Sequence, residues 1–289
     1  MGGIILGSEA VATGLVTRAQ LRWNYRAIYT DVYIPRETVP TIQDRAVGAW
    51  LWSKRRAVIT GRAAAALHGA KWIDDAAPVE IIWANNHTPK GLITRRERLG
   101  ADEVCEFPDG MRVATPARAA LDLGRYLDFG DAVAHLDALA RATAVSAPGV
   151  LALTYRYAGA RGVRCCRTAV DMMDAGAESP KETWLRLLVI RAGYPRPRTQ
   201  IPLYEHGASV AHLDMGWPQI RVGVEYDGDH HRTERSVYVK DMRRAELIDR
   251  LGWLNVRVVK EDREIDILAR VRDAWARRER EGMAVISAR

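Results

Sequence analysis

The feature that most constrains the fold is the stretch 211–259, which reads as two strands, a polar loop, a helix and a third strand. Asp214 closes the run 209–213, and a turn follows at Pro218, because proline fixes its own φ and keeps its predecessor extended. The β-branched run 220–228 comes next and has period-two character. Acidic residues therefore stand at strand ends, where burial of a charge costs free energy unless the charge is paired or binds a metal.

Three of these carboxylates are expected to lie together. Side chains two apart on a strand share a face, so Glu225 and Asp227 point the same way, and Asp214 on the neighbouring strand is expected to join them. Carboxylates this close repel one another unless a hard divalent cation lies among them. Because Mg²⁺ and Mn²⁺ prefer oxygen ligands, Asp214, Glu225 and Asp227 form a predicted metal site.

The order of these residues resembles the core of the PD-(D/E)XK nuclease superfamily. More narrowly, it is similar to the branch that contains the very-short-patch-repair (Vsr-type) endonucleases and the bacterial DUF559 proteins. Four features carry the resemblance: an acidic helix at 179–188, a strand running into 226–231, a helix with the segment 240–244, and a Leu-Gly-Trp corner at 251–253 before the last strand. The resemblance implies a restriction-endonuclease-like mixed sheet flanked by helices over residues 178–281.

The resemblance also implies roles for the acidic residues. Asp214 and Glu225 would hold Mg²⁺ or Mn²⁺, with Asp227 as a further ligand, and the first-helix acid Glu182 would face the metal. Glu182 has a second interpretation, since an acid three residues after Ser179 forms a capping box at a helix start.

The family lysine, two residues after the strand acid, is replaced here by Asp227, so His230, His231 or Lys240 is expected to do its work. Either histidine is a candidate general base or leaving-group acid, and Asp241 would orient that imidazole. Alternatively, the histidines belong to an exposed polar loop, and Asp241 is a surface acid paired on its own helix. The predicted nucleic-acid contacts are Lys240, Arg243, Arg244, Arg161 and Arg164.

The composition supports a polyanionic partner and argues against a membrane protein. The net charge of +7 is carried mostly by arginine, which suits bidentate phosphate contacts, although a basic balance also serves solubility alone. No apolar stretch approaches the ~20 residues of a membrane span, and the first residues lack the pattern of a signal peptide. Three cysteines give neither a disulfide framework nor zinc-ligand spacing, so a cytoplasmic location is expected.

The N-terminal part is expected to contain two further domains and a linker. Residues 1–40 suggest a helix-turn-helix with a β-wing, and their segment 14–21 is similar to the winged-helix domain of AbiEi-type antitoxins. Because only residues 24–28 separate the second helix from the wing, a degenerate winged helix is expected, used either for packing or for DNA binding. Residues 41–145 continue the antitoxin resemblance as a small α/β domain without a catalytic constellation, and their basic run 95–98 is interpreted as a solvated face. Residues 146–177 are expected to be a helical linker, whose Arg161 and Arg164 either touch a phosphate backbone or merely join two domains.

The sequence therefore predicts an α/β chain (α+β overall) that acts as a metal-dependent endonuclease on nucleic acid, with DNA favoured over RNA, in repair or defence. Two alternatives stay open. One is a ribonuclease effector of a toxin–antitoxin or defence system, because the chemistry at phosphorus is shared between DNA and RNA. The other is a non-enzymatic DNA-binding regulator with an inactive nuclease core. Neither the oligomeric state nor a sequence preference can be inferred from the sequence.

Overall fold

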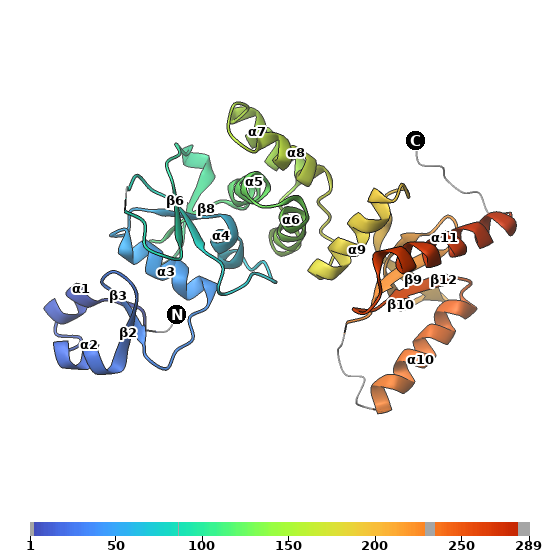
Figure 1. The fold of residues 1–289 in the computed structure, drawn as a ribbon, viewed down its shortest axis with the longest axis horizontal. Helices are drawn as coiled ribbons and strands as arrows, with labels where there is room; N and C mark the ends of the chain where they lie inside the picture. The colour runs from blue at the N-terminus through green and yellow to red at the C-terminus, as the bar shows by residue number, and fades with distance from the viewer. Residues whose placement is uncertain (1–2, 86, 229–234, 283–289) are drawn as a thin grey trace. The chain divides into compact units, whose positions relative to one another are not determined.

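The computed structural model describes residues 3–85, 87–228 and 235–282 (Figure 1). The chain divides into two compact units, residues 1–175 and 176–289, and each is described by itself. The described residues form helices and three sheets, which are antiparallel or mixed. The predicted α/β class is confirmed.

The first unit opens with a three-stranded antiparallel sheet whose spatial order is β1-β3-β2. Its strands and the two helices between β1 and β2 are β1 (Ile5–Leu6), α1 (Gly7–Ala12), α2 (Arg18–Asn24), β2 (Tyr25–Tyr29) and β3 (Val32–Pro35). Helix α2 begins at a capping box in which Thr17 and Gln20 satisfy each other's backbone N–H groups. Helix α3 (Ile42–Trp52) packs on this sheet so closely that a Cβ on Gly48 would lie 2.8 Å from the Ile28 side chain.

The rest of the first unit is a five-stranded mixed sheet, order β6-β5-β4-β8-β7, with helices packed against it. The strands are β4 (Val58–Thr60), β5 (Val79–Ile82), β6 (Leu92–Arg95), β7 (Val104–Glu106) and β8 (Arg112–Ala114). The helices are α4 (Gly61–Leu67), the short 3₁₀ helix η1 (Ala101–Glu103), α5 (Pro116–Tyr126), α6 (Phe129–Thr143), α7 (Ala147–Arg156) and α8 (Val163–Asp171). The hairpin predicted at the Asp-Gly turn is present as β7 and β8.

The segment 146–177, expected to be a linker, forms α7 and α8, which pack against α5. Gly162 lies at φ +80°, and a Cβ there would lie 2.2 Å from the Arg125 carbonyl oxygen, so only glycine permits this approach. A Cβ on Gly124 would likewise lie 2.9 Å from the Cα of Cys166.

A buried charged cluster ties the segment after β6 to helix α5. Arg118 has no exposed surface and donates to Glu97, to Glu103 at 2.9 Å and to Asp122 at 3.1 Å. Glu97 also accepts from Arg125 at 2.9 Å, and its side chain is only 17% exposed. The prediction of a solvated face over residues 95–98 is therefore wrong for Glu97, because charges from α5 enclose it.

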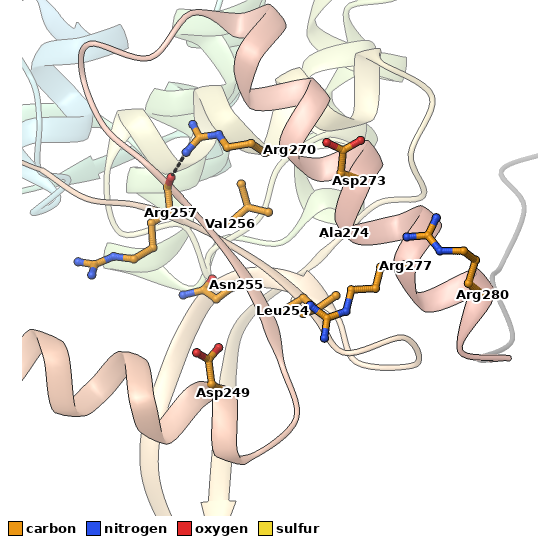
Figure 2. Close-up of a pocket in the computed structure, with 10 residues that line it drawn as sticks. All are labelled: Asp249, Leu254, Asn255, Val256, Arg257, Arg270, Asp273, Ala274, Arg277 and Arg280. Atoms are coloured by element: carbon orange, nitrogen blue, oxygen red, sulfur yellow. Dashed lines mark hydrogen bonds between the residues drawn. The ribbon is translucent and has the colours of Figure 1, made fainter.

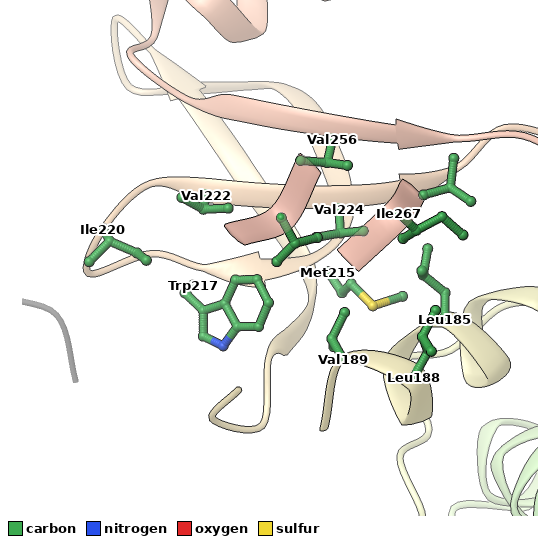
Figure 3. Packing of buried hydrophobic residues seen from close by; sticks show 12 residues of the cluster. Leu185, Leu188, Val189, Met215, Trp217, Ile220, Val222, Val224, Val256 and Ile267 are labelled. Carbon is green, nitrogen blue, oxygen red and sulfur yellow. The ribbon is translucent and has the colours of Figure 1, made fainter. Parts of the chain in front are cut away.

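The second unit is a four-stranded mixed sheet, order β12-β11-β10-β9, with helices on both faces (Figure 1). Its elements are α9 (Pro180–Arg191), β9 (Arg198–Glu205), β10 (Ala208–Trp217), β11 (Val222–Tyr226), α10 (Arg235–Arg250), β12 (Leu254–Val258) and α11 (Glu264–Arg280). Strands β9, β10 and β11 pair antiparallel, while β11 and β12 pair in parallel. One face packs against α9 and α11 through residues such as Leu185, Val224 and Ile267 (Figure 3). Ile248 of α10 lies in a smaller apolar cluster with Leu213.

Strand β10 rotates at Asp214. Leu213 and Met215 are two residues apart, yet they pack in different clusters, Leu213 with Ile248 of α10 and Met215 with α9 and α11. On the neighbouring strand β9, Gln200 has a φ of +46°, which is rare for a residue other than glycine. The usual alternation of faces therefore breaks at the acidic residue itself.

In the part of the chain that the structure describes, no single helix is long and apolar enough to cross a membrane, although α6 and α7, bent by 119°, pass the test of length and composition as a pair.

Candidate functional site

The candidate site lies where β10 and β11 meet, and Asp214 is its centre. The antiparallel register pairs Met215 with Val224, and its continuation by one residue sets Asp214 opposite Glu225. The Asp214 carboxylate accepts a hydrogen bond from the backbone N–H of Tyr226 at 3.0 Å. Burial raises the pKa of Asp214, repulsion from Glu182 and Glu225 raises it further, and the result is about 7. The predicted neighbourhood of Asp214 and Glu225 is therefore present, and Glu182 adds its negative charge to it.

Glu225 is buried, with 5% of its surface exposed, and is clamped from two sides. From α10, the Arg244 guanidinium donates to both carboxylate oxygens, with one distance of 3.1 Å, and also to the carbonyl of His212 at 2.6 Å. From β12, the Asn255 amide donates to Glu225 Oε2. Arg244 was predicted to bind phosphate, but here it lies against Glu225. Its positive charge partly compensates the negative charge of that acid.

Glu182 both caps helix α9 and contributes negative charge to the acidic site. Its backbone N–H donates to Ser179 Oγ at 3.2 Å, and its carboxylate accepts from Ser179 Oγ and from the N–H of Glu178, each at 2.9 Å. These bonds begin helix α9, as a capping acid does. The same carboxylate repels Asp214 and raises its pKa, so the cap is also part of the acidic site.

Asp227 is placed differently from the expectation that it shares a metal with Asp214 and Glu225. Its carboxylate pairs with Arg257 of β12 at 2.8 Å, and its backbone N–H donates to Val258. Within residues 3–85, 87–228 and 235–282, no group of three or more His, Cys, Asp or Glu side chains lies close enough to hold a metal ion.

Some of the remaining predicted residues lie on α10, and others lie outside the residues that the structure describes. His230 and His231 lie outside the described residues. Lys240 and Arg243 are exposed on α10. The negative charge of Asp241 raises the pKa of Arg244 on the same helix, which agrees with the interpretation of Asp241 as a surface acid.

Arg161 and Arg164 belong to the first unit. Both side chains are exposed, and the backbone carbonyl of Arg161 accepts from Arg125 Nε at 2.9 Å, so backbone packing fixes this segment.

The site acids have the donor type of a hard divalent cation, because Asp214 and Glu225 bring carboxylate oxygens from adjacent strands and oxygen is the donor that Mg²⁺ and Mn²⁺ prefer. Both Glu225 oxygens accept from Arg244, so Glu225 fits as a ligand only when Arg244 moves away from it. The pKa of Asp214 is raised first by burial and then by repulsion from Glu182 and Glu225, and a bound cation would offset that repulsion. Asp227 does not fit as a third ligand while its carboxylate pairs with Arg257.

Sequence reasoning missed Asn255 and Arg257, which contact the site acids from the last strand. A signal was present, because the two residues alternate with valines on a strand that was itself predicted. Only the parallel register, which sets Arg257 beside Glu225, shows that these polar residues face the acids.

A second candidate site lies on helix α2 of the first unit. The order β1-β3-β2, with α1 and α2 between β1 and β2, is the order of a winged helix, and α2 lies directly before the second strand. As the short spacing predicted, no further helix lies between α2 and β2 among the described residues. None of the α2 residues is buried, and Arg18, Gln20 and Arg22 are exposed.

A comparison with known protein families gives a match within the first unit. Residues 57–174 match a family described as the AbiEi antitoxin C-terminal domain, which covers the five-stranded sheet and helices α4 to α8. The chain is similar to two uncharacterized proteins of Mycobacterium tuberculosis, MT2308 and Rv2248, each 31% identical over 152 residues. That alignment covers 52% of this chain and 56% of each relative, so the chain spans about half the length of the curated relatives it matches. No solved structure matches the chain significantly. Residues 57–174 are thus similar to an antitoxin domain.

Proposed function

We propose that the second unit is a metal-dependent phosphodiesterase that cleaves nucleic acid, with DNA favoured over RNA, in a protein of toxin–antitoxin or defence type. The observation that carries the proposal is the crowding of carboxylates from three elements: Glu182 of α9, Asp214 of β10 and Glu225 of β11. Crowded acids destabilise the fold unless a cation offsets them, so their presence supports a metal-binding role.

The residues of the chain divide the work as follows. Asp214 and Glu225 supply ligand oxygens, and a bound Mg²⁺ or Mn²⁺ would polarise the scissile phosphate and lower the pKa of a bound water. The Tyr226 N–H holds Asp214 in position through its 3.0 Å hydrogen bond. Arg244, which lies against Glu225, is placed to neutralise a phosphate oxygen beside that acid.

The test is cleavage of labelled single-stranded DNA, double-stranded DNA and RNA by the purified chain in Mg²⁺, Mn²⁺ or EDTA. Asp214→Asn keeps the side-chain shape but removes the charge that a hard cation needs, so metal-dependent cleavage should be abolished. Glu205→Gln is the matched control, because Glu205 is an acid of the same unit that pairs with the exposed Arg250. Cleavage that persists undiminished in Asp214→Asn would belong to a contaminant and would refute the proposal. Cleavage of RNA alone would favour the ribonuclease alternative.

A second function is favoured by the first unit, namely sequence-dependent DNA binding through α2. In this second proposal α2 acts as the recognition helix, and the exposed Arg18 in its first turn reaches base edges in the major groove. Arg36 donates to the carbonyls of Arg22 and Trp23, which holds the helix end on the sheet. The match to an antitoxin family is consistent with such a regulator.

Selection of bound duplexes from a random pool tests this second function. Arg18→Ala should relax the selected sequence at one position, at a cost of about 1–3 kcal/mol in discrimination. Arg55→Ala, an exposed arginine of the same unit that pairs with Glu9, should leave the selected sequence unchanged. A wild-type chain that enriches no sequence would refute base reading by α2.

A further inference from the structure

A groove of 640 Å³ runs along the free edge of the second unit's sheet, between β12 and α11 (Figure 2). Strand β12 is an edge strand, since β11 is its one neighbour in the sheet. Four arginines and two aspartates supply the charged part of the lining: Arg257, Arg270, Arg277, Arg280, Asp249 and Asp273. The groove therefore has a net positive lining.

The arginines of α11 form a row along the groove. Positions 270, 277 and 280 fall on one helix face, and they span ten residues, or about 15 Å of helix axis. Arg277 and Arg280 are exposed. Arg280 makes no ion pair with the described residues, and Arg277 pairs with Glu281 on its own helix at 3.0 Å. Such a row suits a ligand with repeated negative charges.

The edge strand is closed to a fifth strand at its end, from the Arg257 carbonyl to the Val259 N–H. In the parallel ladder, Leu254 N–H donates to Arg221 of the segment before β11, so the intervening Asn255 and Arg257 direct their backbone groups into the groove. The Arg257 carbonyl is already bound by Arg270 Nη1 at 2.7 Å, and Asp262 accepts from the next N–H on that side, Val259, at 2.9 Å. A peptide strand would find these backbone groups occupied, which disfavours an acidic peptide that adds to the sheet.

The groove leads to the acidic site. Two of its lining residues, Asn255 and Arg257, donate to Glu225 and Asp227 respectively. An anionic chain in the groove would therefore reach the acids from the β12 side. Guanidinium groups bind phosphate oxygens in bidentate fashion, and the phosphodiester backbone supplies them at regular spacing.

From these contacts we infer that the groove between β12 and α11 binds the phosphodiester backbone of a nucleic-acid strand and directs it toward Asp214 and Glu225. The inference rests on the proposed nuclease function for its substrate class. It adds a binding surface, with Arg277 and Arg280 as the residues that grip phosphate.

The test is binding of a fluorescent 15-residue oligothymidylate to the full chain in EDTA, followed by anisotropy across a salt series. Binding in EDTA separates the groove from cleavage, and a uniform single strand gives α2 no duplex to read. Arg277→Gln/Arg280→Gln should weaken binding about tenfold and reduce the salt slope by about 1.4, since each lost phosphate contact on a single strand contributes ~0.7. Arg263→Gln/Arg272→Gln removes the same charge from the N-cap residue of α11 and from an exposed position of that helix. Neither residue lines the groove, so neither value should change.

Equal effects of the two double variants would overturn the inference, because the attraction would then depend on net charge alone. A labelled polyglutamate peptide that binds as tightly as the oligonucleotide, with the same loss in Arg277→Gln/Arg280→Gln, would also overturn it in favour of an acidic protein partner. Asp214→Asn should retain binding in EDTA. If the wild-type chain cleaves nothing but the groove variants still lose binding selectively, the nuclease proposal fails and the groove stands.

Discussion

Two clusters of charged side chains, one in each unit, differ in how their charges are balanced. In the first unit, Arg118 lies fully buried among three carboxylates, and hydrogen bonds connect each of them to a cation. In the second unit, Asp214 lies near Glu182 and Glu225, and the nearest cation, Arg244, is bound to Glu225. The pKa values of Glu97 and Asp214 follow this difference, whereas burial raises the pKa of Asp122 within the first cluster. Burial raises the pKa of Glu97, but Arg125, Tyr126 and Arg118 lower it to about 2, whereas the pKa of Asp214 rises to about 7.

The comparison separates a structural cluster from a candidate functional one. A carboxylate with a lowered pKa stabilises the folded state at neutral pH, and one with a raised pKa destabilises it. Glu97 therefore contributes to the fold of the antitoxin-like domain, and Asp214 costs stability in the second unit. A cost of this kind is typical of sites that bind a cation or transfer a proton.

The largest expected effect is the loss of Arg118. Arg118→Leu would remove the fully buried cation that pairs with Glu103 and Asp122, and breaking a buried pair in this way costs about 3–5 kcal/mol. Urea unfolding followed by a first-unit probe measures the change. Arg55→Leu, which breaks the exposed pair with Glu9, should change stability far less. Similar losses of stability in both variants would mean that the buried cluster stabilises the fold no more than an exposed ion pair does.

The opposite sign is expected for Asp214→Asn. The substitution removes a carboxylate that folding makes hard to ionise, so it should stabilise the second unit at pH 8 by on the order of 2–4 kcal/mol without metal. The gain should be absent below about pH 4, where the acid is protonated in both states, and should grow up to about pH 7. Thermal unfolding of both proteins across this pH range measures it. Asp227→Asn should give no such gain, because Asp227 is paired with Arg257, and a gain of equal size there would contradict the comparison.

The acidic site could be predicted in part because its residues are close in sequence. Asp214 and Glu225 stand on consecutive antiparallel strands, so strand periodicity and one turn bring them together. The placement of Asp227 could not be predicted in this way, since its partner Arg257 comes from a strand that arrives after helix α10. Its register with β11 is parallel and is set by packing of the whole sheet, which local patterns do not encode.

The Arg118 cluster could not be predicted, because its members come from separate segments. Glu97 follows β6, Glu103 ends a short 3₁₀ helix, and Arg118 lies on α5. In sequence, Glu97 stands within a run of arginines and looks solvent-exposed. Only tertiary packing turns that run into a buried ion-pair network. A helix-turn-helix with a wing could be predicted for residues 1–40 because its parts are consecutive in sequence, whereas the sheet order β1-β3-β2 depends on tertiary packing.

A smaller effect, of about 2–3 kcal/mol, is expected for Glu97→Gln, and it should depend on pH in the opposite way to Asp214→Asn. Because folding lowers the pKa of Glu97 from its unfolded value near 4.3 to about 2, its contribution is complete above about pH 4.5. The difference between wild type and Glu97→Gln should shrink as the pH falls from 4.5 towards 2. Urea unfolding at several pH values measures it. A constant difference at all pH values would show that Glu97 acts through shape and not through charge.

The smallest effect concerns Glu182, which both caps α9 and repels Asp214. Glu182→Gln keeps an oxygen that can accept the hydrogen bond from Ser179 but removes the charge, so the pKa of Asp214 should fall by roughly 0.5–1. A ¹³C titration of the Asp214 carboxyl group measures that pKa directly. Ser179→Ala is the matched control: it removes the cap, costs about 1 kcal/mol of stability and should leave the pKa of Asp214 in place. A fall in both variants would mean that Glu182 acts on Asp214 through helix position. No fall in either would make burial the main cause of the raised pKa, and Glu182 would then be a cap outside the acidic site.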